Sequence, residues 1–313
     1  MASPIVLVVG SINADIFLDV ARIPLLGETL AATGSRCLVG GKGANQAVAT
    51  SRSNVTTRLL CQFGYDHANL MQEYLAEAGV TIDESSKVHT QVVSGQAIIL
   101  LVPTGDNSIV ILPGANAVWP TELTPQMKQS VKCASIVLLQ CEIPAYVNRL
   151  IAEEAKAVGT TVMWDLGGED REVDDDFLRH VDFVCPNETE LRRCVGSTKS
   201  LDTLDEVLDA ARQLQQRGAS SVLVTRGSAG SVLIDREGGV HCQPAFDVNV
   251  HDTTGAGDCF RGAFAAKLSQ KATLAECLRY AAASSALCVQ KDGATMPSHE
   301  ETLQFLQAHP LTN

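Results

Sequence analysis

The chain has 313 residues, of which 45% are hydrophobic, and a formal net charge of −12 from 24 basic and 36 acidic residues. This length suits one large domain or two small ones. The acidic balance argues against nucleic acid or an anionic membrane as the main partner, because both require a basic face on the protein.

The first ten residues, "MASPIVLVVG", predict a strand. They lack the basic segment of a signal peptide, and no apolar run in the chain approaches the ~18 residues of a membrane span. The ten cysteines form no C-x-x-C pair, and four of them lie in or beside apolar runs: Cys61, Cys133, Cys141 and Cys185. We therefore expect buried thiols in a reducing compartment, with the cytoplasm as the default location.

The first third of the chain predicts a small antiparallel sheet. Short strand-like runs occur at 15–20, 28–33, 96–102 and 108–112, and residues 103–107 form a hairpin turn between the last two. We expect this sheet to be inserted at one edge of the main domain, from about 15–38 and 94–113. Its apolar face must cover something, so the sheet is a lid over a site, a dimer interface, or both.

Beyond residue 130 the pattern changes to strands that alternate with helices. Apolar strands at 135–140, 160–165, 180–185 and 220–225 are separated by helical patterns such as 145–159. Strands that are apolar throughout indicate parallel strands covered on both faces. The pattern predicts an α/β fold with a doubly wound, mainly parallel sheet. Because no linker or internal repeat interrupts it, we expect a single domain over 1–313.

The segment "VHDTTGAGDCFRGAFAAKL" places a glycine-rich turn at the start of an apolar helix. Backbone N–H groups of Gly255, Ala256 and Gly257 would lack partners in the helix, so they suit a phosphate. Asp258 next to that phosphate could accept a proton from an attacking hydroxyl group. Taken alone, the same residues also fit a plain glycine turn in which Asp258 caps the helix.

Other loops follow predicted strands and carry polar groups. Residues 10–17 and 39–51 present Asn13, Asp15, Gly41, Lys42 and Asn45, which suit the hydroxyl groups of a polyol. The second loop is neither a complete dinucleotide fingerprint nor a Walker A loop. Loops at successive strand ends of one sheet are where α/β proteins bind ligands, although each loop alone also fits a plain turn.

Two further loops suit a nucleotide and its metal. In "CPNETE", Asn187 and Glu190 share one side of a helix start and could hold a hydrated Mg²⁺ ion, which prefers oxygen ligands. In "TRGSAG", glycine-rich backbone and Arg226 are suited to a nucleotide.

The segments "GSINAD", "GGKGANQA", "PNETE" and "DTTGAGD" together resemble the signatures of the PfkB-type carbohydrate kinases. The resemblance covers essentially the whole chain in order, and its first two segments resemble the members that act on ribose. It implies phosphorylation of D-ribose at O5 by ATP with Mg²⁺. It also implies a monovalent cation, K⁺, beside the anion hole and a homodimer formed through the lid.

The resemblance also implies roles for individual residues. Asp258 would be the general base, and the amides of Gly255, Ala256 and Gly257 would form the anion hole. The sugar would meet Asn13, Ala14, Asp15, Gly41, Lys42, Gly43, Ala44, Asn45, Glu142 and Asp258. ATP would meet Asn187, Thr225, Arg226, Gly227, Ser228, Ala229, Gly230, Gly257 and Asp258. The monovalent cation would use Asp252, Thr254, Cys288, Lys291, Gly293 and Ser298.

The sequence departs from the family pattern at three places. Asp165 is followed by Leu-Gly-Gly where Pro-Ala-Pro is frequent, Ala282 replaces a frequent polar residue near the adenine, and Ser298 is displaced by one position. The alternatives are a kinase of the same fold for another pentose, fructose or a nucleoside, a non-catalytic sugar- or nucleotide-binding regulator, and a dinucleotide oxidoreductase.

Overall fold

A computed structural model describes residues 3–104 and 106–310. Within them the large sheet has nine strands in the order β15 (Val240–Gln243), β14 (Ser231–Ile234), β13 (Ser221–Thr225), β12 (Phe183–Cys185), β11 (Thr161–Gly168), β10 (Ile136–Cys141), β1 (Ile5–Val9), β4 (Thr56–Leu60) and β6 (Thr81–Ile82). The pairs β13–β14 and β14–β15 are antiparallel, and the other neighbours pair parallel. The chain runs from β1 to one edge and returns through β10 to the other, as predicted for a doubly wound sheet.

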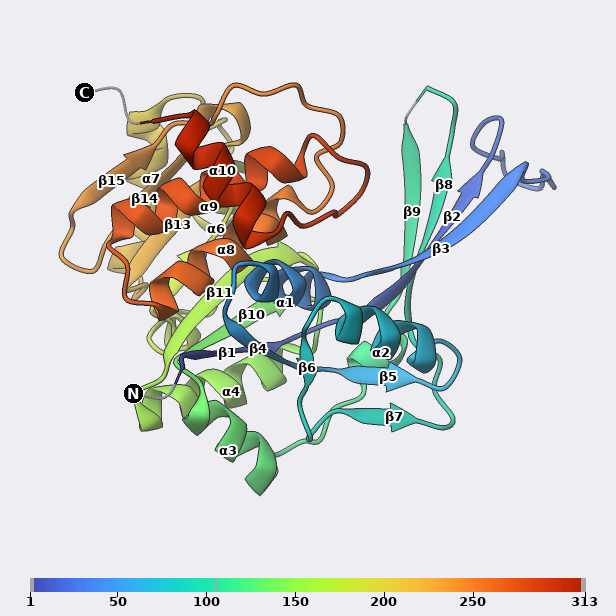
Figure 1. Ribbon diagram of the computed structural model, residues 1–313, viewed down its shortest axis with the longest axis horizontal. Helices are drawn as coiled ribbons and strands as arrows, with labels where there is room; N and C mark the ends of the chain where they lie inside the picture. Colours follow the sequence, from blue (N-terminus) through green and yellow to red (C-terminus); the bar gives the residue numbers. More distant parts are fainter. Residues whose placement is uncertain (1–2, 105, 311–313) are drawn as a thin grey trace.

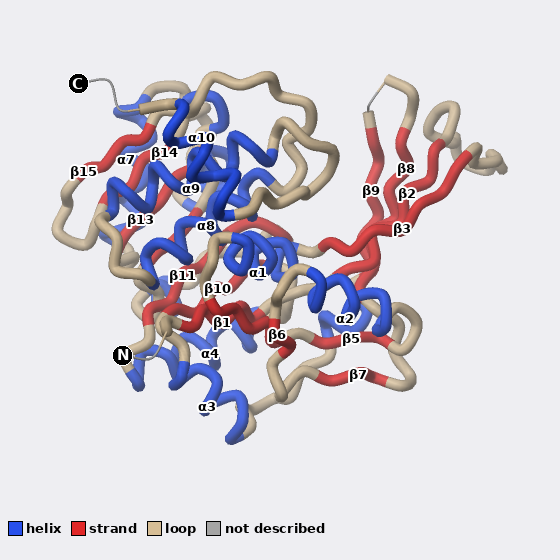
Figure 2. The backbone as a smooth tube through the Cα atoms, viewed as in Figure 1, coloured by secondary structure: helices blue, strands red, loops and turns tan. Residues whose placement is uncertain are grey.

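Helices cover both faces of this sheet (Figures 1 and 2). Alternate residues of β1 show why: Val6 and Val8 pack into one apolar cluster, and Leu7 and Val9 pack into the other. The first cluster is built with α1 (Lys42–Arg52), α2 (Ala68–Glu77), α8 (Ala256–Ser269), α9 (Leu274–Cys288) and α10 (His299–Ala308). The second contains α3 (Pro125–Cys133), α4 (Ala145–Val158), α5 (Asp175–Leu178), α6 (Glu188–Cys194) and α7 (Leu204–Gln216).

The small sheet stands apart from the body in Figure 1. Its order is β3 (Gly34–Gly40), β2 (Asn13–Asp19), β8 (Gly95–Leu101) and β9 (Asn107–Leu112). The separate sheet confirms the prediction. Its two outer pairs are antiparallel, and its central pair, β2 with β8, is parallel. A short parallel pair, β5 (Gln62–Gly64) with β7 (Lys87–His89), and the single turns η1 (Gly114–Ala117) and η2 (Gly227–Ala229) complete the elements.

One expectation about the small sheet is wrong, and another cannot be compared with the structure in full. The strand predicted at 28–33 is wrong, because β2 ends opposite Gly34 and leaves those residues without a strand to pair with. The predicted turn at 103–107 contains Gly105, which lies outside the described residues.

Three of the four cysteines that lie in or beside apolar runs follow the prediction of burial, and Cys37 and Cys242, elsewhere in the chain, are exposed. Cys61, Cys141 and Cys185 are buried, but Cys133 is exposed because it is the last residue of the amphipathic helix α3. In the described part of the chain, no helix combines the length and the apolar character needed to cross a membrane.

Candidate active site

The turn before α8 has the backbone expected of an anion-binding helix start. Gly255 is the N-cap with φ 74°, in the left-handed region, and no side chain caps the helix. A Cβ at this position would also lie 2.5 Å from the Cβ of Ala294. The amide of Ala256 donates to the carbonyl oxygen of Thr253 at 3.2 Å. The amides of Gly255 and Gly257 therefore remain as the donors that open toward a ligand, within the described residues.

Asp258 lies in the first turn of α8 and is only 5% exposed. Asn45 and Gln46 of α1 each donate a side-chain amide to one of its carboxylate oxygens, both at 3.0 Å. The ammonium group of Lys42 lies 3.6 Å from Oδ1 of Asp258. Side chains of α1 thus hold the carboxylate that α8 carries. Each carboxylate oxygen keeps a second lone pair that can accept from a substrate hydroxyl group.

Asp165, at the end of β11, joins Asp258 in a buried polar network. Gln46 donates to Oδ2 of Asp165 at 2.8 Å, and Lys42 lies 3.7 Å from the same oxygen. Arg261, one turn after Asp258 on α8, places Nε 3.0 Å from Oδ1 of Asp165. The charge of Asp258, followed by that of Asp165, raises the pKa of Lys42 against the effect of burial, so Lys42 stays protonated at neutral pH.

The loops predicted to hold the sugar meet beside this network. Asn116 of η1 fixes the segment after β1 by accepting from the amide of Ile12 at 3.0 Å and donating to Oδ1 of Asn13 at 2.7 Å. Oδ1 of Asp15 and Oδ1 of Asn45 are buried and have no hydrogen-bond partner in the described chain. Buried acceptors without partners are costly, so these two oxygens fit the hydroxyl groups of a sugar.

Other residues of the predicted sugar set hold the loops together instead of facing open space. Gly43 donates to Oγ of Ser11 at 3.2 Å, and Ala44 donates to the carbonyl oxygen of Ser11 at 2.9 Å. Oε2 of Glu142, after β10, accepts from Oγ of Ser11 at 2.6 Å and from the amide of Lys42 at 2.9 Å. Ala14 is fully buried, and Gly41 is the N-cap of α1.

Two carboxyl groups in this region have raised pKa values. Burial, followed by the negative charge of Glu142, raises the pKa of Asp15 from 3.8 to about 7. Burial also raises the pKa of Glu142, although Lys42 and Ser11 oppose the rise. A carboxyl group with a pKa near neutrality changes charge when conditions or ligands change.

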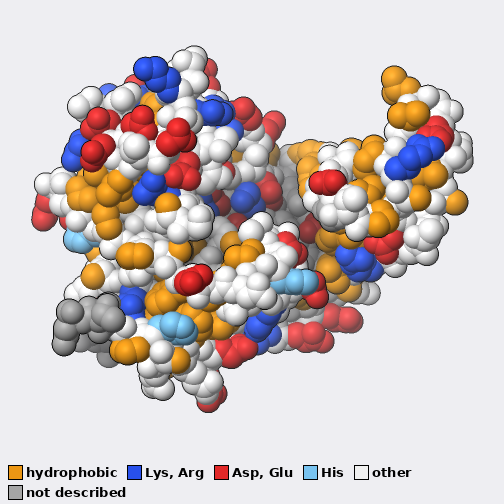
Figure 3. All heavy atoms as spheres, turned by 90° about the horizontal axis from the view of Figure 1, so that it is seen from above, with side chains coloured by type: hydrophobic (Ala, Val, Ile, Leu, Met, Phe, Trp, Pro, Cys, Tyr) orange, Lys and Arg blue, Asp and Glu red, His pale blue; other side chains and the backbone are white. Residues whose placement is uncertain are grey.

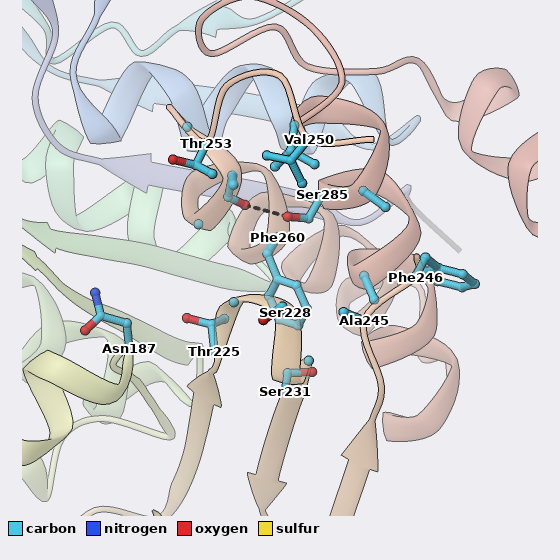
Figure 4. Close-up of a pocket in the computed structure, with 18 of the residues that line it drawn as sticks. Asn187, Thr225, Ser228, Ser231, Ala245, Phe246, Val250, Thr253, Phe260 and Ser285 are labelled. Atoms are coloured by element: carbon cyan, nitrogen blue, oxygen red, sulfur yellow. Dashed lines mark hydrogen bonds between the residues drawn. The ribbon is translucent and has the colours of Figure 1, made fainter. Parts of the chain in front are cut away.

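A cavity of about 750 Å³ opens on the other side of the α8 turn. Its polar end contains Lys42, Glu190, Gly255, Gly257, Asp258 and Arg261, and its apolar end contains Phe246, Val250, Ala282, Ala286 and Val289. Figure 4 shows Thr225 at the end of β13 and Ser228 within η2, across the cavity from Val250 and Ser285. The two ends suit the phosphates and the base of a nucleotide.

Asn187 and Glu190 are brought together by a capping box at the start of α6. Oδ1 of Asn187 accepts from the amide of Glu190, and Oε2 of Glu190 accepts from the amide of Asn187, both at 2.8 Å. Oε1 of Glu190 has no hydrogen bond within the described residues, and both residues line the cavity. Arg226, by contrast, is ion-paired with Glu188 at 3.0 Å and is not among the cavity residues.

The residues predicted to hold a monovalent cation come from two segments that meet beside α8. Oδ1 of Asp252 accepts from the amide of Thr254 at 2.8 Å, and Oδ2 accepts from the amide of Gly293 at 2.9 Å. Burial opposes ionisation of Asp252, but these amide donors hold its pKa below the ordinary value. In the described chain no cluster of three or more His, Cys, Asp or Glu side chains could hold a metal. The family resemblance implies carbonyl oxygens as most of the ligands of this cation.

Lys291 and Ser298 have other contacts. Nζ of Lys291 lies 2.9 Å from Oε1 of Glu301, and its amide donates to the carbonyl oxygen of Cys288 at 3.0 Å. The hydroxyl group of Ser298 caps α10 by accepting from the amide of Glu301 at 3.2 Å. The displaced serine of the sequence therefore serves as a helix cap.

Residues 4–301 match the model of the pfkB family of carbohydrate kinases. The chain belongs to this family. A ribokinase from Arabidopsis thaliana is 38% identical to it over 97% of this chain and 82% of the relative. A deoxyribokinase from Salmonella typhi is 33% identical over 96% of this chain and 97% of the relative. The structure of Arabidopsis thaliana ribokinase complexed with ribose and ATP has a TM-score of 0.93, covers 98% of this chain and 99% of that chain, and is 38% identical.

Sequence reasoning missed several residues of this kinase site. Asp165 was noticed only as a departure from the family pattern, and Ser11, Gln46, Asn116 and Arg261 were not selected at all. A signal existed for two of them: Gln46 follows Lys42 by four residues on α1, and Arg261 follows Asp258 by three on α8. Each therefore lies on the same helix face as a selected residue.

Proposed function

We propose that this chain is a ribose kinase that transfers the γ-phosphoryl group of ATP to O5 of D-ribose, giving D-ribose 5-phosphate and ADP. The main support is the arrangement around Asp258, a buried carboxylate held by Asn45 and Gln46 at the start of a helix whose amides open into a nucleotide-sized cavity. The ribokinase relatives support ribose as the acceptor.

In the proposed reaction Asp258 orients the O5 hydroxyl group and accepts its proton as the oxygen attacks the γ-phosphorus. The O–P bond to ADP breaks, and ADP leaves with the electron pair. The amides of Gly255 and Gly257, together with Lys42, stabilise the negative charge on the transferred group. Asn13, Asp15 and Asn45 hold the other sugar hydroxyl groups, so the reaction is driven by positioning and electrostatics.

Two cations belong to the proposal. Asn187 and Glu190 would hold Mg²⁺ through water, and the ion would supply positive charge to the phosphates of ATP. The loops around Asp252 and Gly293 would hold K⁺ through carbonyl oxygens, and that ion would add positive charge beside the anion hole. Both donor sets consist of oxygen atoms, which suit these hard cations.

We also propose that the chain acts as a single kinase domain whose small sheet is its lid and pairs two copies into a homodimer. In support, β9 is an edge strand with four consecutive exposed apolar residues, Ile109 to Leu112. Figure 3 shows apolar side chains gathered on this projecting part of the molecule. An uncovered apolar edge favours association with another strand.

A second candidate substrate is 2-deoxyribose, because a deoxyribokinase is among the relatives. A single ADP-release assay with ribose, 2-deoxyribose, fructose and adenosine separates the candidates. We expect the highest kcat/KM with ribose. A clearly higher value with any of the other three acceptors would assign the site to that acceptor.

Asp258→Asn tests the base. We expect turnover to fall by ~10²-fold or more while the Kd for ribose is kept, because the amide preserves shape but cannot accept the proton. Titration calorimetry measures ribose binding, and the same ADP-release assay measures turnover. Asp209→Asn, an exposed change on α7, is the control. Near-normal turnover of Asp258→Asn would contradict the assignment.

A further inference from the structure

Arg261 is a charged residue at the active site to which the proposed reaction assigns no role. It lies on α8 three residues after Asp258, is 4% exposed, and lines the cavity at its polar end. An arginine carries five N–H donors in a fixed plane and remains charged under all ordinary conditions. Burying such a group is unfavourable unless its donors are used, so each donor can be followed to its acceptor.

One edge of the guanidinium group is fully engaged by the protein. Nε and Nη2 donate to the carbonyl oxygen of Cys185 at 3.2 and 2.8 Å, at the end of β12. Nε also lies 3.0 Å from Oδ1 of Asp165, and Nη2 lies 3.9 Å from Oε2 of Glu190. These contacts fix the plane of the group between two carboxylates.

The other edge of the group is free and lies against the anion-binding turn. Nη1 makes no hydrogen bond to any residue that the structure describes. A Cβ on Gly257 would lie 2.6 Å from Nη1, so this nitrogen sits directly beside the first turn of α8. Glycine at 257 therefore permits the guanidinium group to approach the turn whose amides are open.

The local charges indicate which ligand this free edge would take. Glu190 and Asp258 place two carboxylates at the polar end of the cavity, and Asp165 is ion-paired with Lys42 and Arg261, which line the same end. Lys42 is also ion-paired with Asp258. The phosphates of a nucleotide would enter against this negative charge. Arg261 is the second cation at that end, and its Nη1 group can donate charge-assisted hydrogen bonds to phosphate oxygens.

We propose that Arg261 is a phosphate-binding residue of this kinase, with Nη1 donating to an oxygen of the terminal phosphates of the nucleotide. The inference deepens the proposed function and depends on the nucleotide occupying the 750 Å³ cavity. The ion pair with Asp165 then orients the guanidinium group of Arg261 toward the phosphates. Asp165 and Arg261 act together as a positioned donor, which accounts for a buried pair at a site where phosphoryl transfer requires fixed positive charge.

The test compares the binding of AMP, ADP and ATP, each with Mg²⁺, to the wild-type chain, Arg261→Gln and Arg261→Lys. We expect Arg261→Gln to weaken ATP and ADP binding by about tenfold or more, the effect of one charge-assisted hydrogen bond. AMP binding should change little, because AMP lacks the terminal phosphates. Arg261→Lys should recover part of the loss. Arg212→Gln, an exposed change on α7, is the matched control.

The double variant Asp165→Asn with Arg261→Gln separates phosphate binding from charge neutralisation. It removes both buried charges together, so it keeps the protein foldable if Arg261→Gln alone is unstable. Persistent loss of ATP binding in the double variant supports the proposal. Recovery of wild-type ATP binding, or equal weakening of AMP, ADP and ATP, would overturn it. Ribose phosphorylation by the wild-type chain is measured separately, so failure of the proposed function is recognisable by itself.

Discussion

At the scale of single residues, Asp15 shows how the site is prepared for a sugar. Its Oδ1 atom is buried without a partner, and its pKa is raised to about 7 by burial and by Glu142. In the unfolded chain the same carboxyl group would titrate near 3.8. The folded protein therefore holds a proton on Asp15 over a pH range where the unfolded chain has lost it.

This difference predicts a pH dependence with a definite sign. Ribose affinity should rise as pH increases through about 7, because the ionised group accepts hydroxyl hydrogen bonds without first losing a proton. Titration calorimetry across this range measures it. Asp15→Asn should bind ribose weakly, with no such step. A wild-type affinity that falls as pH rises through 7 would contradict the assignment.

The raised pKa of Asp15 also makes the stability of the protein depend on pH, and stability should fall where ribose affinity rises. Because the folded state binds the proton more tightly, Asp15 lowers the free energy of unfolding progressively between pH 3.8 and about 7. Without ligand, Asp15→Asn should therefore melt at a higher temperature than the wild type above pH 7, and the difference should disappear in acid. Thermal melts of both proteins, recorded above pH 7 and in acid, provide the measurement.

At the scale of elements, the helix starts differ according to their role. Helices α6, α7, α9 and α10 begin with complete capping boxes. By contrast, α1 and α8 begin at a glycine N-cap with no side-chain cap. Without a side-chain cap, their first amides find other partners: the amide of Lys42 donates to Glu142, and only part of the α8 start stays open. These two helices bring Lys42, Asn45 and Asp258 together. Helices α2 and α4 also lack a side-chain cap, so the glycine N-caps of α1 and α8 are the feature that coincides with the proposed site.

The loops before α8 and after α9 give a prediction at this scale. If K⁺ binds between them, replacing potassium by sodium should lower the turnover of the wild-type chain severalfold. Asp252→Asn should abolish the difference, since it removes one acceptor for the amides of Thr254 and Gly293. Steady-state rates at constant ionic strength provide the measurement. Equal rates in both salts would count against the cation site.

At the scale of the whole molecule, the two sheets have edges of different character. Edge strand β9 exposes four apolar residues in succession, and Val110 is 61% exposed. Edge strand β15 of the large sheet exposes Val240, at 42%. Adjacent strand residues face opposite sides of a sheet, so both faces of β9 are apolar. This edge is the one that a second copy would cover.

Val110→Lys tests this arrangement. We expect the variant to sediment as a monomer at concentrations where the wild type is a dimer, because a lysine on the edge opposes strand pairing. Val240→Lys is the matched control and should leave the oligomeric state unchanged. If the lid depends on its partner, KM for ribose should also rise in Val110→Lys. A Val110→Lys chain that remains dimeric would exclude this surface as the interface.

Much of the fold could be predicted from the sequence because it depends on local patterns. Uninterrupted apolar runs such as 135–140 specified buried parallel strands, and the turn at Gly255 specified an uncapped helix start. The pairing of the small sheet could not be predicted. The strand expected at 28–33 lies at 34–40, because pairing with β2 decides where a strand forms.

By itself, the sequence determined the family, the alternation of strands and helices beyond residue 130, and the position of Asp258 at a helix start, since each depends on residues that are neighbours in the chain. The tertiary structure alone decided which polar groups stay open. It used Gly43, Ala44, Glu142 and Ser298 in loop contacts and a helix cap, and it joined Asp165 to Arg261 across 96 positions of sequence. The physical reason is that a donor or acceptor is available to a ligand only when no distant part of the chain has already satisfied it, and folding brings those distant parts together.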